Sequence, residues 1–141
     1  MKFLSSFLIG ALLILSPSTF AATEAATAAM NFEISSDALT TQGNRYYSYN
    51  FGNVRVDYSQ WADFYLRNNG NGPLYVQGVY LQSGRAYRAW SDCPAYLYPG
   101  QQCLTRVEFR PWYEGYETGR LRFKFANGNI YVDLSGWATR Y

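Results

Sequence analysis

Hydrophobic and polar positions alternate in short runs from Asn50 to Trp137. In RLRFKF, at residues 120–125, Leu121, Phe123 and Phe125 alternate with three basic residues. Period-two alternation places such apolar side chains on one face of a strand. No segment keeps a period near 3.6, so the pattern predicts an all-β domain whose sheets have one apolar face and one solvated face.

Turn signals cut this region into seven predicted strands. Glycine, asparagine and proline cluster in NNGNGP (68–73) and ANGN (126–129), and such clusters end strands. The predicted strands lie in YYSYNF, WADFYLR, LYVQGVYL, AYRAW, CLTRVEF, RLRFKF and IYVDLSGW. Seven short strands in one small domain predict an immunoglobulin-like β-sandwich. We expect Leu134 and Trp137 of the last strand to close it.

The N-terminus has the layout of a secretory signal peptide, assigned to residues 1–21. Lys2 precedes an apolar run from Phe3 to Leu15, Pro17 follows, and small residues come next. The run is shorter than the roughly 20 residues of a membrane-spanning helix. Cleavage would release a mature form without a membrane span, exported to the periplasm or the medium. The alternative is a retained N-terminal anchor.

Residues 22–44 are rich in alanine, threonine and serine. We interpret them as a flexible linker or, through the alternating MNFEIS at 30–35, as an added edge strand. Residues 45–141 then form a single sandwich domain, with no room for a second.

The two cysteines, Cys93 and Cys103, are predicted to form a disulfide, because an even pair in an exported chain is most simply a bridge. Such a bridge contributes roughly 2.5–3 kcal/mol through loss of denatured-state entropy. A redox pair would have closer spacing, and a zinc site would need further ligands that a chain without histidine cannot easily supply.

Charge gives little indication of a partner. The chain has 12 basic and 10 acidic residues, and loss of Lys2 with the leader leaves a net charge of about +1. This balance argues against nucleic acid as a partner. Arginine and tyrosine are abundant, and they suit stacked contacts in and on a β-domain.

Several motifs together resemble the Hydin-type (choice-of-anchor D) immunoglobulin-like domain, which is related to the major sperm protein and PapD-type sandwiches. The pieces are NFGNV (50–54), LRNNGNGPLYV (66–76), CPAYLYPGQQC (93–103), VEFRP (107–111), GYETGRLRF (115–123) and VDLSGWA (132–138). The resemblance implies a seven-stranded scaffold or adhesion module without enzymatic activity. Its relatives commonly occur as repeats, whereas this chain carries one copy.

Catalysis is not expected, and no cofactor or metal site is predicted. The nearest pair of acids, Glu114 and Glu117, could serve glycoside hydrolysis only across a cleft. Two acids on a surface turn are more often simply solvated. Nucleophile, phosphate-binding and calcium-loop motifs are absent from the sequence.

Loop aromatics provide the candidate binding patch. We expect one group on the turn between the fifth and sixth strands and another in the cystine loop, at opposite ends of the domain. The first group is Arg110, Trp112, Tyr113 and Tyr116, and the second is Tyr96 and Tyr98. Flat side chains give contact area at low entropy cost, although they could instead fold back as lids on the core.

The sequence thus predicts an exported, non-catalytic binding or structural module of the bacterial cell envelope that acts through protein contacts. The alternative is a secreted module that binds a glycan or another envelope polymer through loop aromatics. A third hypothesis is assembly, in which an edge strand accepts a strand from a partner or from residues 22–44. The oligomeric state is left open.

Overall fold

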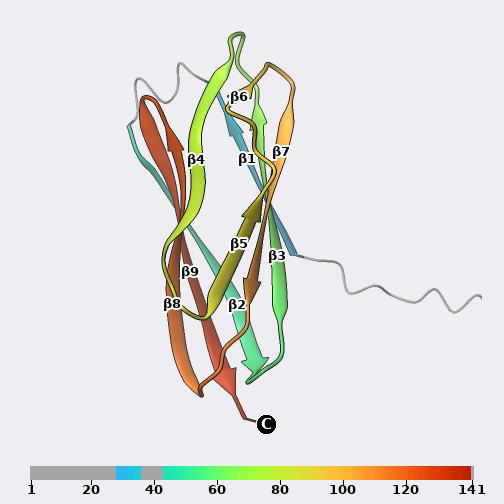
Figure 1. The fold of residues 1–141 in the computed structure, drawn as a ribbon, viewed down its shortest axis with the longest axis vertical. Coiled ribbons are helices and arrows are strands. Elements are labelled where there is room, and N and C mark those ends of the chain that lie inside the picture. Colours follow the sequence, from blue (N-terminus) through green and yellow to red (C-terminus); the bar gives the residue numbers. More distant parts are fainter. Residues whose placement is uncertain (1–27, 36–42, 141) are drawn as a thin grey trace, which may run out of the picture.

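The computed structural model describes residues 28–35 and 43–140 as two β-sheets packed face to face (Figure 1). The predicted signal peptide, much of the 22–44 segment and Tyr141 lie outside the described residues. One sheet has the strand order β1 (Ala28–Ile34), β3 (Gln60–Asn68), β7 (Gln102–Phe109), β5 (Tyr87–Ser91). The other has the order β2 (Arg45–Arg55), β9 (Gly128–Thr139), β8 (Gly115–Phe125), β4 (Leu74–Ser83), β6 (Tyr96–Leu97).

The prediction of an all-β sandwich is confirmed, and all seven predicted strands are present. The described residues add two more, because β6 is a short strand within the cystine loop and β1 lies in the MNFEIS patch. β1 pairs in parallel with β3, from Ala28 opposite Ala62 to Ile34 opposite Asn68. Residues 28–34 are therefore part of the sandwich. The described residues contain no helix that could cross a membrane.

The core lies between the sheets and follows the predicted alternation. Phe64, Leu121 and Phe123 are fully buried, whereas the basic residues that alternate with the last two face outward. The central strands pack closely here. A Cβ at Gly136 would lie 2.5 Å from Cε1 of Phe109, so glycine lets β9 approach this ring.

β1 contributes two fully enclosed side chains, and so it closes one edge of the core. Phe32 and Ile34 are 2% and 1% exposed. The Phe32 ring lies 4.7 Å from the ring of Tyr47 in β2 and 5.8 Å from that of Phe123 in β8. This strand therefore joins the two sheets.

Candidate functional site

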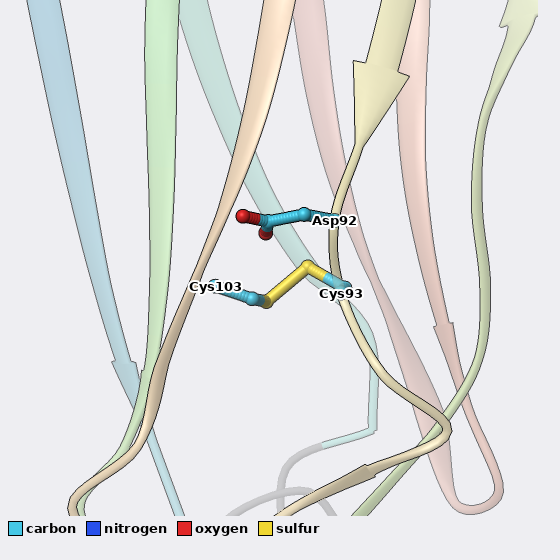
Figure 2. A group of neighbouring side chains, drawn as sticks. All are labelled: Asp92, Cys93 and Cys103. Carbon is cyan, nitrogen blue, oxygen red and sulfur yellow. A yellow bond between two sulfur atoms is a disulfide. The ribbon is translucent and has the colours of Figure 1, made fainter.

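The predicted disulfide is confirmed and fixes the loop between β5 and β7. The Cα atoms of Cys93 and Cys103 are 4.9 Å apart. Asp92 lies beside the bridge (Figure 2), where its carboxylate accepts a hydrogen bond of 2.6 Å from the Leu104 amide. Although Asp92 and the two sulfurs form a compact group, the sulfurs are bonded to each other, so this group is structural.

The loop aromatics do not form one patch. The connection between β7 and β8 lies at one end of the molecule and β6 lies at the other (Figure 1). Trp112 and Tyr113 are exposed in the β7–β8 connection, which also carries Arg110. A cavity of only about 20 Å³ lies beside them, and about one water molecule fits such a space.

Two of the predicted loop residues lie on strands instead. Tyr116 is the second residue of β8, which begins at Gly115, five residues before the start of the predicted RLRFKF strand. Tyr96 is in β6, where its ring lies 5.2 Å from that of Tyr75 in β4. Tyr98 remains in the cystine loop and is exposed. Placement on a turn was therefore wrong for Tyr116, whereas Tyr96 lies within the cystine loop as predicted, on the short strand β6.

The two acids considered for catalysis occupy ordinary surface positions. Glu114 forms an ion pair of 3.3 Å with Arg140. Glu117 lies in β8, and its backbone carbonyl accepts a hydrogen bond of 3.0 Å from the hydroxyl of Tyr87. Burial raises the pKa of this Tyr87 hydroxyl, which keeps it protonated as a donor.

The outer face of the five-stranded sheet is the main concentration of exposed aromatic and cationic side chains, and we call it the tyrosine face. The ladder registers place four side chains in one row across β2, β9, β8 and β4: Tyr46, Tyr131, Arg122 and Tyr80. The rings of Tyr46 and Tyr131 stack at 5.1 Å. The Arg122 guanidinium carbon lies 5.7 Å from the Tyr131 centroid and 5.8 Å from that of Tyr80. This row forms a continuous platform of rings and one cation.

An ion pair borders the row on the same face. Arg120 and Asp133 lie directly opposite each other in β8 and β9, with Nε and Oδ1 2.6 Å apart. The hydrogen bond to Asp133 raises the pKa of Arg120, which is a cation at every working pH. The Asp133 side chain is 51% exposed, so the pair can contact a ligand.

Next to this pair the face is hollowed into a trough of about 440 Å³. Most of its lining residues are short and polar, and one ring lies at the end: Ser48, Ser83, Thr118, Ser135, Arg120, Asp133 and Tyr116, together with Gly119 and Leu134. The volume lies within the range of small-ligand sites.

Tyr116, which lines one end of the trough, packs beside a second half-exposed ring. Tyr116 and Trp137 are opposite each other in β8 and β9, and their ring centroids are 5.0 Å apart. Trp137 is 52% exposed, so the expectation that it closes the sandwich was wrong. Leu134 is buried as expected.

The outer face of the four-stranded sheet has a different character, and we call it the tryptophan face. Trp61 and Trp90 lie 5.5 Å apart between centroids. Arg106 binds Asp63 through Nε and Nη2 at 2.7 and 2.9 Å, and these hydrogen bonds lower the pKa of the Asp63 carboxyl. The Asp63 side chain is only 6% exposed, so Arg106 satisfies a buried carboxylate, whereas the Arg106 side chain is itself 48% exposed and lines a hollow of about 270 Å³ with Trp90.

No protein-family model matches the chain, and no curated protein is significantly similar to it. Solved structures share its fold. The secreted serine protease VesC of Vibrio cholerae is 19% identical over 63% of this chain, and the Vibrio cholerae protease VesB is 15% identical over 65%, each with a TM-score of 0.50. The matches cover 21% of the VesC chain and 30% of the VesB chain, so they concern a part of each protease.

The PapD-like domain 7 of human CEP192 is 17% identical, with a TM-score of 0.50. This match covers 69% of the present chain and 84% of that domain. At such identities the likeness concerns the fold, which is an immunoglobulin-like, PapD-type sandwich.

The tyrosine face was missed in the sequence, although part of its signal was there. Alternation alone places Tyr116, Thr118 and Arg120 on one side of a strand. The pairing of β8 with β9, and of β9 with β2, brings these residues onto one face with Trp137 and Tyr46. Attributing the strand aromatics to packing confines the predicted patch to the loops.

Proposed function

We propose that this chain is an exported, non-catalytic binding module of the bacterial cell envelope, and that it binds its partner on the tyrosine face. The observation that carries the proposal is the row of Tyr46, Tyr131, Arg122 and Tyr80 on the exposed side of four hydrogen-bonded strands. Tyrosine, tryptophan and arginine are the residues that dominate binding energy at interfaces.

The sheet makes this surface well suited to binding. Side chains on paired strands are already ordered, so a partner loses little conformational entropy by contacting them. The loop patch around Trp112 and Tyr113 lacks a comparable hollow, since its cavity is about 20 Å³ against about 440 Å³ for the trough.

Export and the absence of catalysis are supported by separate features. The Cys93 to Cys103 disulfide is compatible with an oxidising compartment such as the periplasm or the medium. The absence of histidine removes the commonest general base, and Glu114 is engaged by Arg140. The resemblance to Hydin-type domains is a more specific assignment than the PapD-type fold. It also implies a scaffold or adhesion module.

The test is co-sedimentation of the mature protein, residues 22–141, with an isolated bacterial cell-envelope fraction. The double variant Tyr131→Ala with Arg122→Ala is expected to weaken binding about tenfold or more, because both side chains belong to the platform. A matched control is Trp61→Ala with Arg88→Ala, because Arg88 is an exposed residue of β5 in the same row as Trp61. This variant alters the tryptophan face and should bind like the unmodified protein.

The loop hypothesis is tested in the same assay with Trp112→Ala plus Tyr113→Ala. Retention of this variant at the unmodified level is expected. If the loop variant loses binding while the Tyr131 and Arg122 variant keeps it, the tyrosine face is the wrong surface. Circular dichroism and thermal unfolding of each variant show that lost binding is not lost folding.

A further inference from the structure

We infer that the trough on the tyrosine face binds an uncharged saccharide chain. The inference rests on the proposed function of this face and names the chemical class of its ligand. The glycan-binding site is thus inferred at the centre of a sheet and not on the loops. For this surface we favour a glycan over a protein as the ligand.

The position of the trough restricts how a ligand can be held. β8 and β9 are both interior strands of the sheet, with β4 and β2 as their outer neighbours. Their backbone groups are engaged in the ladders, so a partner strand cannot add here as it could at an edge. Recognition must therefore come from side chains alone.

The floor offers hydroxyl groups in two adjacent rows. Ser48 is opposite Asp133 and Arg120 is level with Ser83, while Thr118 is opposite Ser135. A hydroxyl can donate one hydrogen bond and accept two, as the hydroxyls of a sugar also can. A floor of short hydroxyl side chains therefore complements a polyhydroxylated ligand in either direction of hydrogen bonding.

The charge of the lining favours a neutral ligand. Arg120 and Asp133 are the two charged groups that line the trough, and they neutralise each other at 2.6 Å. An anionic polymer would meet the exposed Asp133 carboxylate, whereas a neutral sugar can use it as an acceptor and the remaining guanidinium N–H groups as donors.

The aromatic ends supply the apolar contact. Tyr116 lines one end with Trp137 against it, and Arg120 at the other end lies 5.3 Å from the Tyr131 centroid. Tyr116 and Arg120 are four positions apart in the same strand, which corresponds to about 13 Å at the usual rise per residue. A ring face is electron-rich and attracts the polarised C–H groups on the flat side of a sugar.

A protein hot spot would need a different cavity. Such contacts centre on an apolar anchor buried in a matching pocket. Serine, threonine and an ion pair supply most of the trough floor, and the apolar residue in its lining, Leu134, is only 1% exposed, so an apolar anchor finds little to pack against.

The experiment combines defined sugars with selective destruction of the envelope partner. Neutral oligomers of glucose and of N-acetylglucosamine, two to six units long, are titrated into the mature protein while tryptophan fluorescence and amide NMR shifts are recorded. In parallel, the envelope fraction is treated either with periodate, which cleaves vicinal diols of sugars, or with protease.

The expected results are saturable shifts at residues of β8 and β9 and loss of envelope binding after periodate but not after protease. Trp137→Ala should weaken binding about tenfold. Trp90→Ala is the matched control, because Trp90 is 51% exposed on the tryptophan face and Trp137 is 52% exposed. This control should bind normally.

Two results would contradict the inference that the trough binds a saccharide. One is envelope binding that survives periodate but is abolished by protease, and the other is equal binding by Trp137→Ala and the unmodified protein. Protease-sensitive binding that still depends on Tyr131 and Arg122 would leave the proposed function intact with a protein partner. A protein that never binds the envelope and shows no shift with any sugar would remove both proposals.

Discussion

Two arginine–aspartate pairs illustrate how similar residues serve different ends. Asp63 faces Arg106 across β3 and β7, and Asp133 faces Arg120 across β9 and β8. The Asp63 side chain is 6% exposed and receives two hydrogen bonds, whereas that of Asp133 is 51% exposed. The first pair satisfies a buried carboxylate, and the second is available to a ligand.

The pair at Asp63 gives a prediction about pH. Because Arg106 lowers the pKa of Asp63 in the folded state, the carboxylate stabilises the fold above its unfolded pKa of about 3.9. This contribution is lost as pH falls through the lower folded value. In Asp63→Asn, the free energy of unfolding should therefore change less between pH 5 and pH 2, as measured by urea unfolding.

The control for this prediction is Asp133→Asn, which removes an exposed carboxylate. Between pH 5 and pH 2, the unfolding free energy of Asp133→Asn should change by nearly as much as that of the unmodified protein. The change for Asp63→Asn should be smaller. An Asp63→Asn profile that is superimposable on the unmodified one would show that the Arg106 contact does not stabilise the fold.

Residue-level alternation predicted the core well and could have predicted more. Leu121, Phe123 and Phe125 are buried as their spacing requires. Leu134 and Trp137 are three positions apart, an odd number, so a regular strand places them on opposite faces. Gly136 takes the inward position against Phe109, and Trp137 therefore faces solvent.

At the scale of elements, β1 is the strand whose role is most readily tested. Phe32 is 2% exposed and packs near Tyr47, Phe64 and Phe123. Truncation of such a side chain leaves a cavity and costs about 3 kcal/mol or more. Phe32→Ala should lower the free energy of unfolding by this amount in chemical denaturation.

Asn31→Ala supplies the matched control, because Asn31 is an exposed neighbour in the same strand. It should change stability by less than about 0.5 kcal/mol. Equal stability of Phe32→Ala and Asn31→Ala would mean that β1 does not belong to the core in solution.

Strand pairing is the part of the fold that the sequence could not supply. Each strand is visible in local alternation, but its neighbours depend on contacts between distant residues. β2 pairs in parallel with β9, which brings Tyr46 against Tyr131 from opposite ends of the domain sequence. A platform built across such strands cannot be found from a local pattern.

At the scale of the whole molecule, the two outer faces have different compositions. The tyrosine face combines a platform of three rings and Arg122 with a polar trough, and the tryptophan face combines two indoles with an ion pair whose carboxylate is buried. The predicted loop aromatics are divided between the two ends (Figure 1). The proposed binding surface therefore lies on one face and does not include the loops at either end.

Hydroxyl-radical footprinting of the mature protein, free and bound to the envelope fraction, tests the central claim most directly. It reports the solvent contact of tyrosine and tryptophan rings on every surface in one experiment. We predict protection of Tyr46, Tyr116, Tyr131 and Trp137, with Trp61, Trp90 and Trp112 modified as in the free protein. Protection of those three tryptophans with the tyrosine face unchanged would contradict the account.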